Sequence, residues 1–252
     1  MARMSAMALT ASQCLPRVPS IAASAAMNGT ACARTRLTCC ASVMPRTAVG
    51  HTTPLAFPSV EPRATACLYA CLCSFALDYA ARQKIGGTHL TYGYLKQLPV
   101  LPPSRFDAVG AWSPGSPLHE WLLPRVLELT YTAWDLETFA KDVGCEGPPF
   151  RWDPARRALL RAELDAAFFH LYGIARDDVD YIMETFPVVK GHDEKAHGEY
   201  RTKRLILEIY DELAVAARTG RPYVSRLDPP PADPRVAHAE STRPAWAKKG
   251  AS

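Results

Sequence analysis

The first 60 residues lack any aspartate or glutamate, although they contain arginines. Organellar transit peptides share this arginine-rich, serine-rich and acid-poor composition. Residues 1–33, however, show no sustained helix or strand period. We therefore favour a disordered or non-native N-terminal extension over residues 1–33, with a transit peptide as the alternative.

Long apolar runs are also missing, because no stretch approaches the roughly 20 apolar residues of a membrane-spanning helix. This predicts a soluble, cytoplasmic protein with no membrane partner. The net charge is only +4, with a pI near 8.6, which permits a phosphate-bearing partner without requiring one.

The eight cysteines lack zinc-site spacing, since a single residue separates Cys71 from Cys73. We predict reduced, buried thiols and no metal.

The remaining chain predicts an α+β fold in which a small mixed sheet packs on a long helix and a mainly helical C-terminal lobe follows. The strands are expected near 36–60 and 88–101, and the long helix over 62–84. Asp153-Pro154 predicts a capped helix to Tyr172. Further helices are expected from Pro124, over 136–143, from 177 until Pro187, and over 199–218. The predicted organisation is an α+β region over 34–105, a loop over 106–118, a helical lobe over 119–220 and a disordered tail over 221–252.

The stretch Ala80–Pro103 combines a basic cluster, a Gly86-Gly87 turn and a proline-rich exit. Donors of this kind suit a nucleic-acid surface, because Arg and Lys bond guanine or phosphate and Gln can bond adenine. Two alternatives remain open: the cations can complement a helix C-terminus, and the histidine can brace the turn. Our candidates for DNA contact are Arg46 and His51 in the early strands, and Arg82, Gln83, Lys84, Thr88 and His89 around the turn.

A second basic cluster lies near the start of the last helix, at Arg201, Lys203 and Arg204. It could hold phosphate. The alternative that we favour is a solvated helix face on which these cations pair with Glu199, Glu208 and Asp211.

The sequence offers little support for a catalytic site. Asp193-Glu194-Lys195 has nuclease-like spacing, but no companion acidic residue precedes it on an apolar strand. Glu163 and Asp165 are two residues apart on a helix, so we interpret them as solvating charges on different faces. The sequence therefore predicts no catalytic residue and no metal ligand.

Five blocks of the sequence occur in a characteristic order. They are RTRLTCCASVMPRTAVGHTTPLAF at 34–57, SFALDYAARQKIGGTHLTYGYLKQLPVLPP at 74–103, WLLPRVLELTYTAWDLETFAKDVG at 121–144, FRWDPARRALLRAELDAAFFHLYGI at 150–174 and GEYRTKRLILEIYDEL at 198–213. Together these blocks resemble the C-terminal target-recognition region of bacterial adenine-specific DNA methyltransferases of restriction-modification systems. This resemblance implies a sequence-recognition fragment with double-stranded DNA as its partner, together with a methyltransferase catalytic domain or subunit.

The catalytic motifs of that family are missing from this chain. The family binds S-adenosylmethionine with a glycine-containing loop and holds a flipped adenine with an Asn/Asp-Pro-Pro-Tyr/Phe tetrapeptide. The nearest tetrapeptide here begins with Gly147, and Pro148, Pro149 and Phe150 follow it. We therefore expect no cofactor in this chain and no enzymatic activity of the chain alone. The alternatives are a non-functional truncated remnant and a specificity subunit that docks on a separate catalytic chain.

Overall fold

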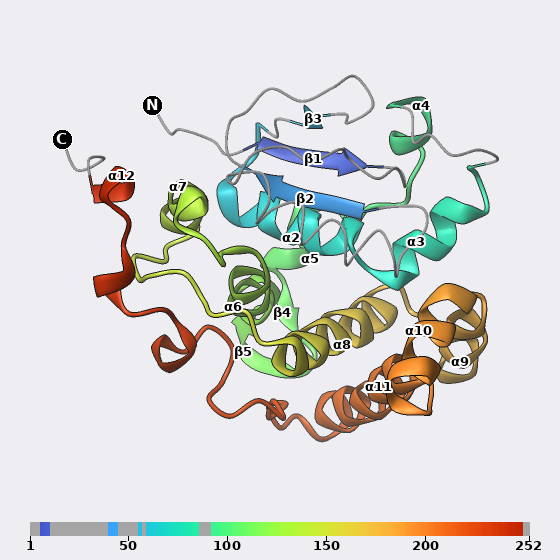
Figure 1. The fold of residues 1–252 in the computed structure, drawn as a ribbon. Helices are drawn as coiled ribbons and strands as arrows, with labels where there is room; N and C mark the ends of the chain where they lie inside the picture. Colours follow the sequence, from blue (N-terminus) through green and yellow to red (C-terminus); the bar gives the residue numbers. More distant parts are fainter. Residues whose placement is uncertain (1–5, 11–39, 45–54, 57–58, 86–91, 249–252) are drawn as a thin grey trace.

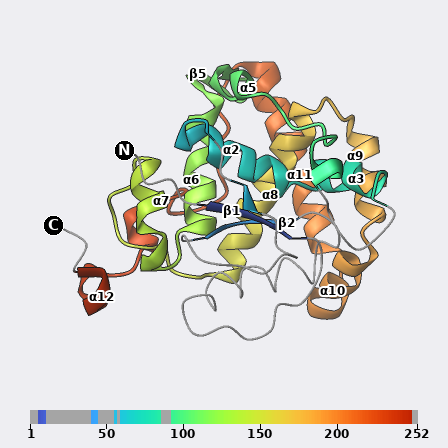
Figure 2. The same ribbon diagram turned by 90° about the horizontal axis from the view of Figure 1, so that it is seen from above.

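The computed structural model describes residues 6–10, 40–44, 55–56, 59–85 and 92–248. This part of the chain is mainly helical with small antiparallel sheets, so its class is α+β. Helix α8 (Pro154–Leu171) packs between α6 (Leu118–Thr130) and α11 (Arg201–Thr219) (Figures 1 and 2). Four residues with predicted DNA contacts lie outside the described residues: Arg46, His51, Thr88 and His89.

A three-stranded sheet lies against α2, with strand order β2-β1-β3 (Figure 1). Both pairings are antiparallel, so the predicted mixed sheet is not what the described strands form. The strand β1 comes from the segment for which the sequence predicts no regular element. Over the second predicted strand region, the described residues form the short helix α4 (Tyr92–Leu95) instead. The strand bounds are β1 Ala6–Thr10, β2 Cys40–Met44 and β3 Leu55–Ala56.

The predicted long helix is divided in two, α2 (Pro62–Leu72) and α3 (Phe75–Arg82), with a bend of 60° between them. Ser74 causes the division: its hydroxyl donates to the Cys71 carbonyl at 2.8 Å and accepts from the Leu77 amide at 3.3 Å. This side chain thus caps the new helix. Within the described residues no single helix has the length and apolar character to cross a membrane, and only the bent α2–α3 pair passes that test jointly.

Helix α6 (Leu118–Thr130) starts before Pro124, which lies inside the helix rather than in its first turn. The hairpin β4–β5 precedes α6 in the sequence. The 3₁₀ turn η1 and the short helix α7 follow α6. The bounds are α5 Pro103–Asp107, β4 Val109–Gly110, β5 Ser113–Pro117, η1 Trp134–Leu136 and α7 Glu137–Asp142.

The central helix α8 (Pro154–Leu171) begins as predicted, because the Asp153 carboxylate accepts from the amides of Ala155 and Arg156 at 2.9 and 3.0 Å. Helix α11 (Arg201–Thr219) packs along it and ends at Gly220, whose φ of 68° is left-handed. This end is also as predicted.

Pro187 was predicted to end a helix, and it also begins one. Helix α9 (Arg176–Glu184) ends just before it, and α10 (Pro187–His197) starts at it. Proline is compatible with a first helical turn, because the amide that it lacks has no partner there. Helix α10 has a single buried residue, Val189, and therefore lacks the apolar periodicity that would predict it from the sequence.

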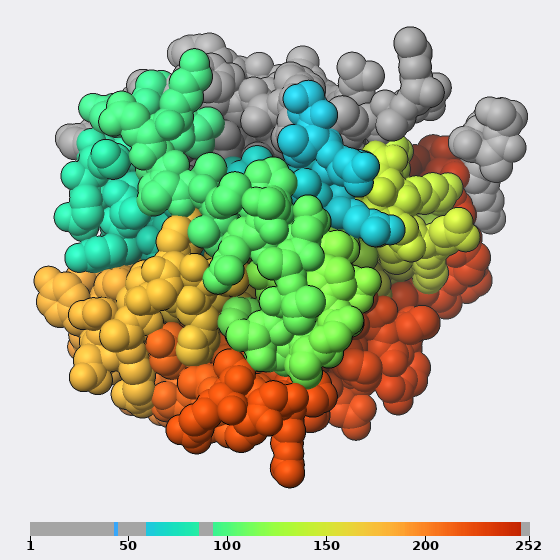
Figure 3. Space-filling model, turned by 180° about the vertical axis from the view of Figure 1, so that it is seen from behind, coloured from blue at the N-terminus to red at the C-terminus, as the bar shows by residue number. Residues whose placement is uncertain are grey.

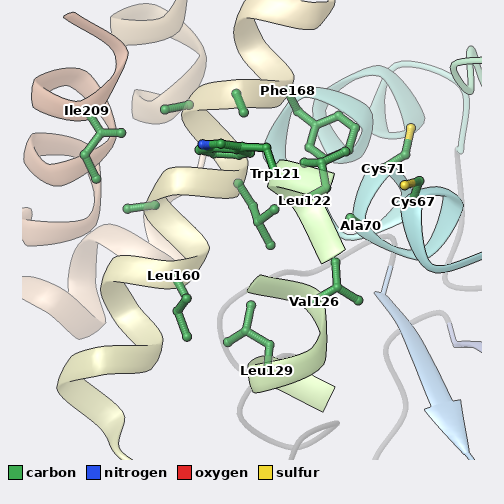
Figure 4. Close-up of a cluster of buried hydrophobic side chains, with 14 of the residues drawn as sticks. Cys67, Ala70, Cys71, Trp121, Leu122, Val126, Leu129, Leu160, Phe168 and Ile209 are labelled. Carbon is green, nitrogen blue, oxygen red and sulfur yellow. The ribbon is translucent and has the colours of Figure 1, made fainter. Parts of the chain in front are cut away.

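The core extends from α2 through α6 to α8 and α11 (Figure 4). Leu122 and Val126 of α6 lie between Cys67, Ala70 and Cys71 of α2 and the side chains of α8 (Figure 4). Fully buried Leu160 and Phe168 supply the α8 side. Burial raises the pKa of Cys67 to about 12, which keeps this thiol protonated.

The C-terminal tail, predicted to be disordered from its proline-rich composition, is described to residue 248 and packs on the helices (Figure 1). The Tyr223 amide donates to the Trp112 carbonyl at 2.8 Å, and the His238 amide donates to the Pro149 carbonyl at 2.7 Å. The tail therefore belongs to the folded unit. Its short elements are η2 Pro234–Val236, η3 Glu240–Thr242 and α12 Ala245–Lys248.

Candidate nucleic-acid interface

The stretch singled out in the sequence forms a corner between α3 and α4, which we call the α3–α4 corner (residues 82–85 and 92–97). A small apolar cluster holds it in place: Leu77 and Ala81 of α3 pack with Leu98, and Leu95 of α4 lies against them. The Tyr172 hydroxyl fixes the exit by donating to the Pro99 carbonyl at 2.7 Å. In Figure 3 the atoms of α3 and α4 form one continuous part of the surface at the upper left.

Arg82 is engaged within the protein rather than presented to solvent. Its guanidinium pairs with Asp78 at 3.3 Å, donates to the Thr185 carbonyl at 3.4 Å and lies 4.1 Å from the centre of the Phe186 ring. Only 18% of its side chain is exposed. Arg82 therefore braces α3 against the α9–α10 junction, and its predicted DNA contact would require these bonds to break.

The other polar side chains of the corner face solvent. Gln83 and Lys84 are exposed at the end of α3, and Lys96 and Gln97 are exposed after α4. Among the described residues no carboxylate pairs with Lys84 or Lys96. Each glutamine donates its amide nitrogen to a carbonyl four residues earlier, at 3.5 Å for Gln83 and 3.1 Å for Gln97. One donor hydrogen and the carbonyl oxygen of each amide remain available.

Lys96 and Gln97 are not among the residues that we predicted from the sequence to contact DNA. The available signal was their chemistry, because they repeat the amide-plus-lysine pair of Gln83 and Lys84 within the same stretch.

Two of the three cations in the second basic cluster, Lys203 and Arg204, pair with carboxylates. Lys203 lies 2.9 Å from Asp180 and 2.6 Å from Glu184, and hydrogen bonds from Lys203 and Lys190 lower the pKa of Glu184. Arg201 is half-buried at the first position of α11. The partners of Lys203 lie on α9 and are not the carboxylates expected from the sequence, while phosphate contact stays a prediction.

Arg204 is paired on both sides. It lies 2.8 Å from Glu199 and 2.9 Å from Glu208, and the hydrogen bonds that it donates to these carboxylates raise its pKa. A shallow hollow of about 280 Å³ opens beside this cluster, and its third cation, Arg176, pairs with Asp211 at 2.8 Å. Every cation of the hollow thus has a counter-charge, which disfavours it as an anion site. The lining residues are Arg176, Tyr200, Lys203, Arg204, Leu207 and Glu208.

Glu163 and Asp165 are not solvating charges, so that interpretation is wrong. Glu163 is fully buried, and Asp165 is buried with its carboxylate accepting from the Phe75 amide at 2.9 Å, which caps α3. Helical spacing could have predicted the burial of Glu163, because Glu163 lies three residues after Leu160 on the inward face of the helix.

The residues weighed for catalysis have structural contacts. Asp193 accepts from the Thr202 amide at 2.5 Å, close to the start of α11. Phe150, at the end of the Gly-Pro-Pro-Phe sequence, is buried edge-on against Tyr131 with ring centres 6.3 Å apart. In the part of the chain that the structure describes, no group of three His, Cys, Asp or Glu side chains could hold a metal ion.

Comparisons with known proteins give no family for this chain. No protein-family model, no curated protein and no solved structure matches it.

Proposed function

We propose that this chain binds double-stranded DNA through the α3–α4 corner, as the recognition part of an adenine-specific methyltransferase of a restriction-modification system whose catalytic domain is elsewhere. One observation carries the proposal: two exposed amides and two exposed ammonium groups lie at one corner, and no described carboxylate pairs with either ammonium group. Ammonium groups hold phosphates and set register, whereas an amide can bond adenine at both of its major-groove positions.

The burial of the α2–α3 apolar face supports a folded recognition unit over a partly folded remnant. A remnant that had lost its packing partner would expose this face. Instead the chain covers the face itself, because α2 packs on α5 and α6 and α3 packs on α8. The buried residues include Ala66, Cys67, Ala70, Cys71, Phe75 and Leu77.

The test measures the affinity of the full chain for a duplex of mixed sequence over a series of salt concentrations, by fluorescence anisotropy. The change is the double variant Lys84→Gln/Lys96→Gln. If both lysines contact phosphate, the slope of log affinity against log salt falls by about 2, since each contact contributes about 0.9. The matched control is Lys195→Gln/Arg218→Gln, which also removes two exposed charges and leaves the α3–α4 corner intact.

A second arm addresses sequence readout. Gln83→Ala and Gln97→Ala should reduce the preference for sites containing adenine by about 1–3 kcal/mol for a bidentate contact, as measured by selection from randomised duplexes. The proposal is wrong for the isolated chain if wild type fails to bind duplex DNA even at low salt, or if the control variant loses as much of the slope as the lysine variant.

A further inference from the structure

Residues 221–236 cross α6 and α8 without forming a helix before the short turn η2, and we call this segment the strap (Figure 1). It leaves α11 at Gly220, where the left-handed backbone ends the helix and changes the chain direction. Leu227 is the one strap residue that is buried, and Val224 is 81% exposed. Leu227 belongs to the apolar core, and the partly buried side chains of Tyr223, Ala232 and Val236 pack against that core.

The first anchor of the strap is the carboxylate of Glu163, which is fully buried. One oxygen, Oε2, accepts from Arg125 Nε at 2.7 Å within the helical core. The other, Oε1, accepts from the hydroxyls of Tyr223 and Ser225, at 3.0 and 2.6 Å. One half of a core carboxylate thus receives its donors from the strap.

The second anchor is an ion pair that bonds the strap backbone. Glu128 of α6 and Arg156 of α8 pair with each other in the interior. Glu128 Oε2 also accepts from the Ala232 amide at 2.8 Å, and Arg156 Nη2 donates to the Pro230 carbonyl at 2.9 Å. Recognition of a backbone amide and a backbone carbonyl is the chemistry by which proteins bind extended peptides.

We propose that the strap is a releasable segment, docked on a peptide-binding surface made by Arg125, Glu128, Arg156 and Glu163. The surface takes an extended segment that carries hydroxyl side chains, and its occupant is the strap of the same chain. Each carboxylate keeps its arginine when the strap leaves, and water then reaches the oxygen that the strap had occupied. This device does not depend on the proposed DNA binding.

The experiment uses the full chain with a site-specific protease sequence inserted between Gly220 and Arg221. After cleavage, the released segment is removed, and a labelled synthetic peptide of residues 219–240 is added back. Circular dichroism follows the fold of residues 1–220, while anisotropy and native mass spectrometry follow rebinding. We expect the helical content to persist and the peptide to rebind with one peptide per chain.

Peptide variants identify the anchor without affecting the fold of the larger fragment. A peptide with Tyr223→Phe and Ser225→Ala should bind at least about tenfold more weakly, because it lacks both hydrogen bonds to the buried carboxylate. The control peptide, Val224→Ala, changes an exposed side chain and should bind like the wild type. Unfolding upon removal of the segment, failure of the peptide to rebind, or equal affinity of the hydroxyl-lacking and control peptides would each overturn the proposal.

Discussion

Removal of the Glu163 carboxylate should destabilise the fold far more than removal of a surface carboxylate. Glu163→Ala leaves Arg125 charged in the interior, with its guanidinium 3.5 Å from the centre of the Trp121 ring and its Nη1 bonded to the Trp121 carbonyl at 2.6 Å. Burial already lowers the pKa of Arg125, and the facing Glu163 opposes that shift. Without the carboxylate, the desolvation cost of the cation has no counterpart.

The magnitude follows from the nature of the pair. Breaking a buried ion pair by removing one partner costs about 3–5 kcal/mol, whereas replacing both partners with apolar side chains of similar size is often neutral. We therefore expect Glu163→Ala to lower the free energy of unfolding by about 3–5 kcal/mol. Arg125→Met/Glu163→Met should recover about 2 kcal/mol or more of that loss, since neither position then holds an unpaired buried charge.

The assay is urea unfolding followed by circular dichroism and tryptophan fluorescence, for the wild type, Glu163→Ala, the single variants Arg125→Met and Glu163→Met, and the double variant. Glu208→Ala is the control, because this carboxylate forms exposed pairs with Arg204 and Arg226 and should contribute less than about 1 kcal/mol. The reasoning is refuted if Glu163→Ala costs no more than the control, or if the double variant loses the sum of the two single losses.

Three further predictions concern single side chains. Burial lowers the pKa of His170 below its usual 6.5, although a hydrogen bond with a backbone carbonyl opposes this shift. The stability that His170 contributes is therefore present above pH 6.5 and lost as the pH falls through the pKa of the folded state. His170→Gln should flatten the dependence of Tm on pH between pH 7 and 5, and an unchanged profile would contradict this. The Cys67 thiol should resist a disulfide-exchange reagent in the native protein while half-exposed Cys145 reacts, as peptide mapping would reveal; equal labelling would refute the buried assignment. Asp153→Ala should cost about 1 kcal/mol in urea unfolding through loss of the α8 cap, whereas an unchanged midpoint would exclude a capping contribution.

The helices that the sequence predicted well are those with strong local signals. Asp153-Pro154 starts α8 and Gly220 ends α11, and both signals act through hydrogen bonds and backbone angles within one turn. The division at Ser74 was missed, because the apolar pattern on both sides of it is continuous. Pro187 was ambiguous, since a proline can follow one helix and begin the next.

What the sequence could not indicate depends on contacts between distant residues. The candidate Arg82 pairs with a carboxylate four residues earlier and lies over the Phe186 ring at the α9–α10 junction, so its exposure could not be predicted from the local pattern. The proline-rich tail has the composition of a disordered segment. Its order comes from Glu163 and Glu128, whose partners lie 60 to 104 residues away along the chain.

The position of the strap after α6, α8 and α11 in the sequence has a consequence for synthesis. Translation proceeds from the N-terminus, so Glu163 leaves the ribosome before Tyr223 and Ser225, which are 60 and 62 residues further on. Until those residues emerge, the carboxylate has Arg125 and water as its partners, and the tail bonds to the helices cannot form. The nascent chain therefore completes the hydrogen bonds of Glu163 only after the strap has emerged, and a premature stop after α11 would produce a chain that never receives them.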